Sequence, residues 1–140
     1  MGERRVSAGG RRLSMETILV VDDEDAVRAV AKDVLEIKGY TVLDTGDPRH
    51  ALRIAREHAG PIALVLTDVV MPLMNGPQLA ERLLEIRPGT KILFMSSFDV
   101  SGILAPNTPF IAKPFDVGEL ARRVRQVLDR RSPFSAPPRP

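Results

Sequence analysis

Residues 17–25 read TILVVDDED, in which a run of apolar residues passes directly into four consecutive acids. Residues 18–21 are all apolar, without the alternation of a half-exposed strand, and this predicts a strand that is buried on both faces. Burial on both faces requires helices on both sides of the sheet, which is typical of parallel sheets. The acids then lie at the carboxyl end of this strand, where open parallel sheets carry their functional sites.

The same alternation of buried strand and amphipathic helix continues along the chain. Residues 26–38 show the helical spacing of apolar side chains, and Gly39 follows in the position that commonly ends a helix. Further strands are expected at 41–45, 62–67, 91–96 and 110–112, and further helices at 48–59, 77–86 and 117–130. The pattern predicts an α/β fold, a doubly wound five-stranded parallel sheet with right-handed crossovers.

The connection between the last two strands departs from this regular pattern. It includes Gly102 and Pro106 within residues 97–108, and Pro109 follows directly. A parallel crossover needs a dozen or more residues, and proline is poorly tolerated inside a helix, so a full helix hardly fits. We expect the fourth helix to be short or irregular.

The composition of the 140-residue chain excludes several classes of protein. Cys and Trp are absent, and there are only two His and one Tyr. Disulfides, thiolate metal sites, Cys nucleophiles, His-rich metal clusters and aromatic nucleic-acid platforms are therefore not expected. No apolar run is long enough to cross a membrane, and the N-terminus lacks the apolar region of a secretory signal. We expect a cytoplasmic protein that contacts neither membrane nor nucleic acid directly.

The sequence pI of 9.4 comes from the two ends of the chain. Residues 1–14 carry four Arg against one Glu and are rich in Gly and Ser, whereas residues 132–140 contain four Pro. Such segments are typical of solvated, disordered termini. We expect a disordered basic tail at 1–14, one folded domain at 15–131 and a Pro-rich disordered tail at 132–140.

The ends of the predicted strands carry residues that suit phosphoryl chemistry. The acids 22–25 follow the first strand, Asp68 the third, Ser96 the fourth and Lys113 the fifth. Carboxylates at the ends of neighbouring strands lie about 5 Å apart, so raised pKa values or a bound cation must relieve their repulsion. Oxygen ligands without an all-protein cage favour Mg²⁺. A carboxylate is then the available nucleophile, Lys113 a charge for phosphate oxygens and Ser96 a hydrogen-bond partner.

The acids and Ser96 also have purely structural explanations, and Lys113 before a proline is by itself uninformative. Acids before a helix serve equally as N-caps and as partners of the helix dipole. Asp68, in a loop before Pro72, is also a common turn residue, and Ser96 can simply end a strand. The joint occurrence of all of them at one edge of the sheet favours a site.

The chain from residue 17 to 130 resembles the receiver domain of response regulators, the chemotaxis-regulator-like phosphoacceptor of two-component signal transduction. The resemblance rests on an ordered set of motifs, namely ILVVDDE at 18–24, LTDVVMP at 66–72, NG at 75–76, Ser96 and KPF at 113–115. It implies a flavodoxin-like fold with strand order 2-1-3-4-5. The short connection after Ser96 is similar to that of receivers in hybrid histidine kinases and phosphorelays.

The resemblance also implies the roles of the acids. Asp68 is then the phosphoprotein's modified residue, carrying an aspartyl phosphate. Asp23, Asp68 and the backbone carbonyl of Val70 are expected to bind magnesium directly, with Asp22 acting mainly through water.

The remaining site residues follow from the same resemblance. Lys113 is expected to contact the phosphoryl group, and its peptide bond to Pro114 is expected to be cis. Ser96 and Phe110 occupy the two switch positions.

The function implied is that of a signalling phosphoacceptor rather than an enzyme. Its partners are a histidine kinase or histidine phosphotransfer protein as donor, and a downstream protein that binds a surface switched by phosphorylation. No output domain is expected, because only a Pro-rich stretch follows Arg131. Two alternatives stay open: a degenerate receiver fold that only docks, and a haloacid dehalogenase-type phosphatase. Asp23 and Asp25 have the spacing of such a phosphatase, but Asp68 is then left without a role.

Overall fold

The structure, a computed structural model, describes residues 16–130, which hold five strands and four helices. The strands are β1 (Thr17–Val21), β2 (Thr41–Thr45), β3 (Leu64–Asp68), β4 (Lys91–Ser96) and β5 (Phe110–Ala112). The helices are α1 (Asp25–Ile37), α2 (Pro48–Glu57), α3 (Gly76–Ile86) and α4 (Val117–Asp129). The expected tails at 1–14 and 132–140 lie outside the described residues, as do the outermost residues of the domain expected at 15–131.

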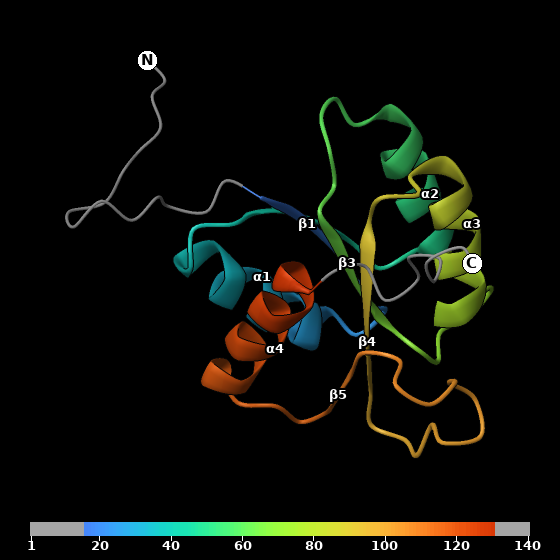
Figure 1. The fold of residues 1–140 in the computed structure, drawn as a ribbon. Helices are drawn as coiled ribbons and strands as arrows, with labels where there is room; N and C mark the ends of the chain where they lie inside the picture. The colour runs from blue at the N-terminus through green and yellow to red at the C-terminus, as the bar shows by residue number, and fades with distance from the viewer. Residues whose placement is uncertain (1–15, 131–140) are drawn as a thin grey trace, which may run out of the picture.

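All strands are parallel and lie in the order β2-β1-β3-β4-β5, as expected (Figure 1). Val21 at the end of β1 pairs with Thr67 of β3, and Asp68 pairs with Met95 of β4. Ser96 at the end of β4 pairs with Ala112 of β5. The register therefore brings the residues that follow β1, β3, β4 and β5 to one edge of the sheet.

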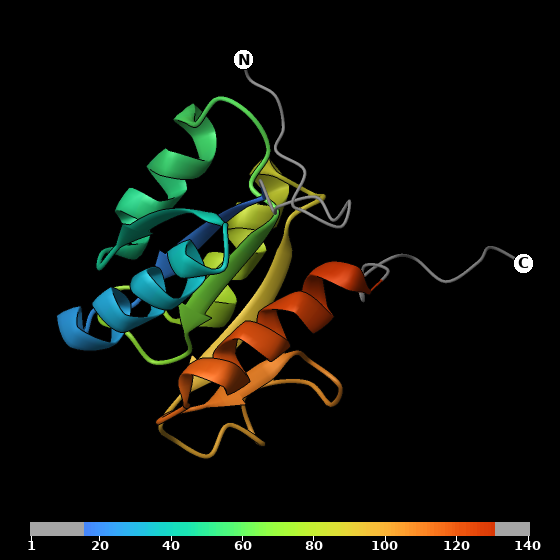
Figure 2. The same ribbon diagram turned by 90° about the vertical axis from the view of Figure 1, so that its left-hand side faces the viewer.

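Helices cover both faces of the sheet (Figures 1 and 2). Ile18 and Val20 of β1 pack in one core with α1 and α4, whereas Leu19 and Val21 pack in a second core with α2 and α3. The neighbouring strands β3 and β4 divide their side chains in the same way. This two-sided burial is why the strand sequences are apolar without alternation.

The helix ends follow local signals in the sequence, with one exception. Gly39 adopts a φ of 99° just after α1, a conformation that glycine accepts without strain. The helix expected over 48–59 instead ends at Glu57. Arg87 donates hydrogen bonds to the carbonyls of Ala55, His58 and Gly60, at 2.6–2.7 Å, and so satisfies carbonyl groups at and beyond this end.

The connection between β4 and β5 is irregular, as expected, and contains turns but no helix in the described chain. Val100 and Leu104 anchor it by packing against the core on the α2–α3 side.

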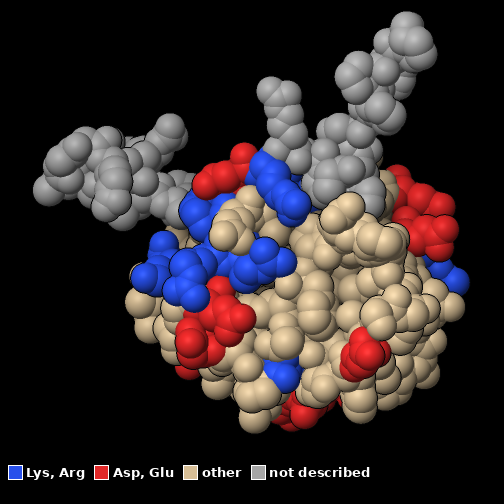
Figure 3. All heavy atoms as spheres, turned by 60° about the horizontal axis from the view of Figure 1, so that its bottom comes forward, with Lys and Arg blue, Asp and Glu red and all other residues tan. Residues whose placement is uncertain are grey.

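The face drawn in Figure 3 gathers Lys and Arg side chains on one side and leaves a broad area beside them uncharged. None of the helices within residues 16–130 is long and apolar enough to cross a membrane.

Gly76→Ala is expected to destabilise the domain by about 1–3 kcal/mol. A Cβ at Gly76 would collide with the backbone carbonyl of Asp68, and a backbone atom cannot rotate away. The loop that carries Asp68 would have to shift. Urea denaturation followed by circular dichroism measures the loss.

Gly89→Ala is the matched control, because among the described residues nothing lies within 4 Å of a Cβ built there. An equal loss of stability in both variants would show that the close approach of α3 to Asp68 is unimportant.

Candidate functional site

The carboxyl edge of the sheet gathers acids around one lysine. Lys113 Nζ donates hydrogen bonds to Asp22 Oδ2 at 2.9 Å, Glu24 Oε1 at 2.9 Å and Asp68 Oδ2 at 3.1 Å. The side chains of Asp22 and Asp68 are 0% and 9% exposed, and that of Lys113 is 6% exposed. The structure therefore brings together Asp22, Asp68 and Lys113, which the strand ends predicted to meet.

Asp22 is held by the turn between β1 and α1. The backbone amide of Glu24 donates to Asp22 Oδ1 at 2.8 Å. Arg28 of α1 donates to the carbonyl oxygen of Asp22 at 2.7 Å and pairs with Asp44 of β2 at 3.0 Å. These contacts orient the carboxylate of Asp22 so that it points toward the ends of the neighbouring strands.

Asp68 is the last residue of β3 and is positioned by the loop that leads to α3. The backbone amide of Val70 points to Asp68 Oδ1 at 3.4 Å. The amide of Gly76 donates to the carbonyl of Val69 at 2.8 Å, which draws the start of α3 close to Asp68. The side chain of Asp68 is thereby directed at Lys113 and Asp22.

Lys113 directly follows β5, and the two expected switch residues lie on the adjacent strands β4 and β5. The amide of Lys113 donates to the carbonyl of Ser96 at 2.9 Å, and the Lys113–Pro114 bond is cis, as the resemblance implied. Ser96 is buried, and its hydroxyl accepts a hydrogen bond from the amide of Phe98 at 2.9 Å. Phe110 lies on β5, two residues before the partner of Ser96, and packs against the α2–α3 core.

The structure adds one acid of the run to the site. Within residues 16–130, the carboxylates whose oxygens lie within 4.8 Å of one another are Asp22, Glu24 and Asp68. Asp23 is exposed and stands outside this group, so its role as a metal ligand stays a prediction. Sequence reasoning missed Glu24, whose only signal was its place in the acid run.

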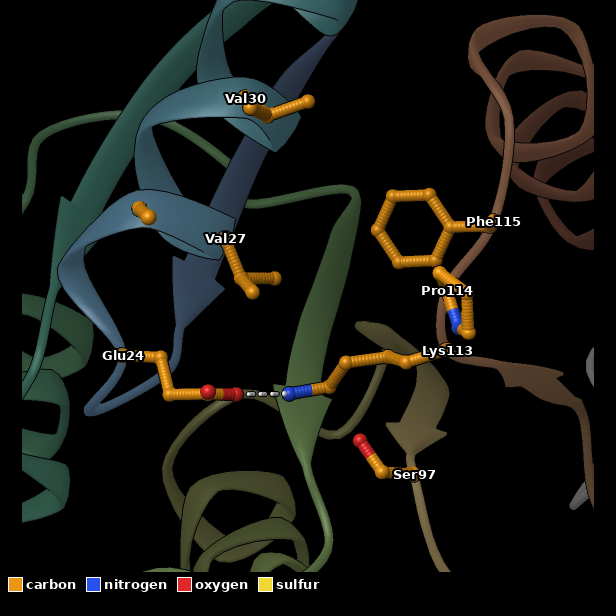
Figure 4. Close-up of a pocket in the computed structure, with 8 residues that line it drawn as sticks. Glu24, Val27, Val30, Ser97, Lys113, Pro114 and Phe115 are labelled. Carbon is orange, nitrogen blue, oxygen red and sulfur yellow. Dashed lines mark hydrogen bonds and ion pairs between the residues drawn. The ribbon is translucent and has the colours of Figure 1, made fainter.

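Helix capping does not explain this use of Glu24. Glu24 is the N-cap residue of α1, yet within the described chain its side chain makes no capping hydrogen bond. Its carboxylate reaches Lys113 instead, beside an apolar groove of ≈ 340 Å³ between α1 and the segment after β5 (Figure 4). Val27 and Phe115 form opposite walls of that groove.

Burial and ion pairing act against each other in this site. Burial raises the pKa of Asp22, and the hydrogen bonds from the Glu24 amide and from Lys113 only partly offset it. Burial lowers the pKa of Lys113, but its bonds to Asp22 and Glu24 outweigh this and leave that pKa raised. One ammonium thus faces three carboxylates. The excess of negative charge and the oxygen-only donors fit a hard divalent cation such as Mg²⁺.

The family model of the response regulator receiver domain matches residues 18–125. This chain belongs to the response regulator receiver family. Receiver domains are signalling modules of two-component systems, and the family binds Mg²⁺ at an acidic pocket. The resemblance drawn from the motifs is therefore confirmed, together with the fold class.

The chain is similar to the sensor kinase CckA of Brucella abortus (strain 2308), with 35% identity over 91% of this chain. It is also 33% identical over 81% of its length to the response regulator receiver protein CpdR of the same organism. The chain spans 14% of that CckA and 27% of the regulator NtrC of Azospirillum brasilense, but 98% of CpdR.

Two solved structures that resemble this fold are receiver domains as well. The receiver domain from the hybrid histidine kinase CckA matches with a TM-score of 0.71 and 40% identity, over 81% of this chain and 99% of that one. A CheY-like receiver domain protein from Methanospirillum hungatei JF-1 matches with a TM-score of 0.74 and 27% identity, over 83% and 95%.

Asp22→Asn is expected to raise the free energy of unfolding of the metal-free domain at pH 7 by about 1 kcal/mol. The pKa of Asp22 is raised above its ordinary value of 3.8, so the native state holds this proton to higher pH than the unfolded chain. The charged carboxylate therefore destabilises the native state above its native pKa. Urea titrations without Mg²⁺ should show a gain that shrinks as the pH falls toward 3.8.

Asp33→Asn, at an exposed position on α1, is the control and should leave stability nearly unchanged. A clear loss of stability for Asp22→Asn at pH 7 would mean that the ion pair with Lys113 outweighs the burial of Asp22.

Proposed function

We propose that this domain accepts a phosphoryl group from a phospho-histidine donor onto Asp68 in a Mg²⁺-dependent reaction. The observation that carries the proposal is the Asp68 carboxylate 3.1 Å from the Lys113 ammonium, at the edge where Asp22 also lies. An Asp68 oxygen attacks phosphorus and forms the O–P bond. The N–P bond to the donor imidazole breaks, and its electron pair stays on the imidazole nitrogen.

The surrounding residues suit this transfer. Asp22, Asp23, Asp68 and the carbonyl of Val70 would hold Mg²⁺, which neutralises charge on the transferring phosphoryl oxygens when bound. Lys113 supplies a second positive charge for those oxygens. Ser96 can donate its hydroxyl to one of them, since among residues 16–130 that hydroxyl only accepts, from the amide of Phe98.

The relatives support a proposal for the class of partner. CckA is named a sensor kinase and CpdR a response regulator receiver protein, which supports a phosphorelay with a histidine kinase or histidine phosphotransfer protein as donor. We infer a downstream protein that reads the surface around Ser96 and Phe110, and a cytoplasmic location shared with these partners.

The two alternative functions have weaker support. A docking module without phosphorylation would not need Asp22, Asp68 and Lys113 gathered within hydrogen-bond distance. A phosphatase built on Asp23 and Asp25 would use two exposed acids, of which Asp25 pairs with Arg28 at 2.8 Å. The site therefore favours a signalling phosphoacceptor over a turnover enzyme.

Asp68→Asn should abolish labelling by acetyl phosphate in the presence of Mg²⁺ while leaving the fold intact. The change is nearly isosteric, but the amide is not a nucleophile. Intact-protein mass spectrometry should find one added phosphoryl group on the wild type and none on the variant. Circular dichroism checks the fold.

Asp33→Asn on the exposed face of α1 should be labelled like the wild type. Full labelling of Asp68→Asn would move the acceptor elsewhere, and turnover of an added phosphomonoester would favour the phosphatase.

The phosphorylated state is expected to decay slowly. Hydrolysis needs a water held in line with the O–P bond by polar groups. The positions that flank the site are apolar: Val70 lies two residues after Asp68, and Phe98 lies two after Ser96. Phe98 lines a cavity of ≈ 640 Å³ together with Ser96 and Lys113. Val70→Asn, Phe98→Glu and the double variant should each lose the phosphoryl group several-fold faster.

Ile103→Glu is the matched control, an exposed apolar side chain of the same loop that does not line this cavity. Decay is followed by mass spectrometry after removal of acetyl phosphate. Equal decay rates for the wild type and the polar variants would remove the role of both flanking residues.

A further inference from the structure

Lys113 uses its whole hydrogen-bonding capacity on the acids of the site. An ammonium group has three N–H donors, and those of Lys113 reach one oxygen each of Asp22, Glu24 and Asp68. The ammonium thus stands among the same oxygens that could hold a metal ion. Lys113 and a divalent cation must compete for Asp22 and Asp68.

Glu24 differs from the other two carboxylates that bind Lys113. Its side chain is 59% exposed, whereas those of Asp22 and Asp68 are buried. It extends from the turn before α1 on a longer stem, and within residues 16–130 its carboxylate is not used for capping. Glu24 can therefore follow the ammonium outward, which the two short, buried aspartates cannot do.

We propose that Glu24 is a positioning residue that holds Lys113 beside the Asp22–Asp68 pair when a divalent cation takes that pair. This inference rests on the proposed function and assigns Glu24 a part in it. When the cation enters, the ammonium gives up Asp22 and Asp68 and keeps Glu24. Lys113 then remains near Asp68, where an incoming phosphoryl group needs its charge, without repelling the cation at closest range.

Loss of Glu24 should weaken the binding of Mg²⁺. In Glu24→Gln, the charged partners left to the ammonium among the described residues are Asp22 and Asp68, so it competes more strongly for both. Because one partly exposed ion pair is lost, the Kd for Mg²⁺ should rise by about threefold. Isothermal titration calorimetry with Mg²⁺ alone, on the unphosphorylated full chain, measures this Kd directly. A salt concentration of about 0.15 M screens the contribution of distant charges.

A second background separates this role from direct ligation. In Lys113→Met there is no ammonium to hold, so adding Glu24→Gln should leave the Kd for Mg²⁺ unchanged. If Glu24 itself bound the metal, the added substitution would weaken binding in this background as well. That result would overturn the proposal.

Two further variants separate reach from charge. Glu24→Asp keeps the charge but shortens the side chain, and Asp at an N-cap position tends to bond the helix amides, so this variant should behave like Glu24→Gln. Glu36→Gln removes a matched Glu–Lys pair, with Lys32 at 2.8 Å, twelve residues further along α1, and should bind Mg²⁺ like the wild type. Wild-type affinity in Glu24→Asp would show that only the charge matters, and would overturn the proposal.

The ammonium itself provides a readout independent of affinity. Nitrogen-15 NMR of the lysine side chains should show a Lys113 ammonium signal that remains protected from exchange in Mg²⁺-loaded wild type and is lost in Mg²⁺-loaded Glu24→Gln. Equal signals would overturn the proposal while leaving phosphorylation of Asp68 untouched. Absence of Mg²⁺ binding by the wild type would overturn the proposed function as well.

Discussion

The ammonium of Lys113 is the counter-charge that lets two buried carboxylates stand at the ends of adjacent strands. Asp22 follows β1 and Asp68 ends β3, and these two strands pair in parallel register, so the fold itself forces the acids together. Without a cation between them they would repel each other at short range in a poorly hydrated place. Lys113 arrives from β5, at the far edge of the sheet, and so joins the first and last parts of the domain through one charge. The ammonium lies among the same carboxylate oxygens that could hold a metal ion.

Most of the fold could be predicted because its decisive signals are local. The apolar residues 18–21 predict a strand buried on both faces. The structure shows the reason, because Ile18 packs in one core and Leu19 in the other. The missing helix between β4 and β5 was equally visible, in the short, proline-containing connection. The end of α2 was not. It involves Arg87, some thirty residues away in sequence, which donates hydrogen bonds to the carbonyls of Ala55 and His58.

The site residues at the strand ends could be predicted from the sequence, whereas those within the acid run at 22–25 could be predicted less well. Strand ends are set by register, so Asp68, Ser96 and Lys113 could be brought to one edge from the sequence. Residues 22–24 lie in the turn between β1 and α1, where a small change of backbone direction decides which side chain faces the site. Here the Glu24 amide caps the carboxylate of Asp22, and Arg28 holds the carbonyl of Asp22, so Glu24 turns inward to Lys113 while Asp23 faces solvent. That choice depends on contacts with α1 and β2 that no local pattern encodes.

The segment next to the site between β4 and β5 is an irregular connection and not a packed helix. The Ser96 hydroxyl accepts from the amide of Phe98, the first turn of that connection, at 2.9 Å. If this hydroxyl rotates to donate to a phosphoryl oxygen on Asp68, its hydrogen bond with the amide of Phe98 is lost. That amide must then bond to another acceptor or to water. Val100 and Leu104 anchor the connection through apolar contacts, and it lacks the continuous hydrogen bonds of a helix. Phosphorylation of Asp68 would therefore first alter residues 97–109, which lie beside Phe110 in the surface proposed above for a downstream partner.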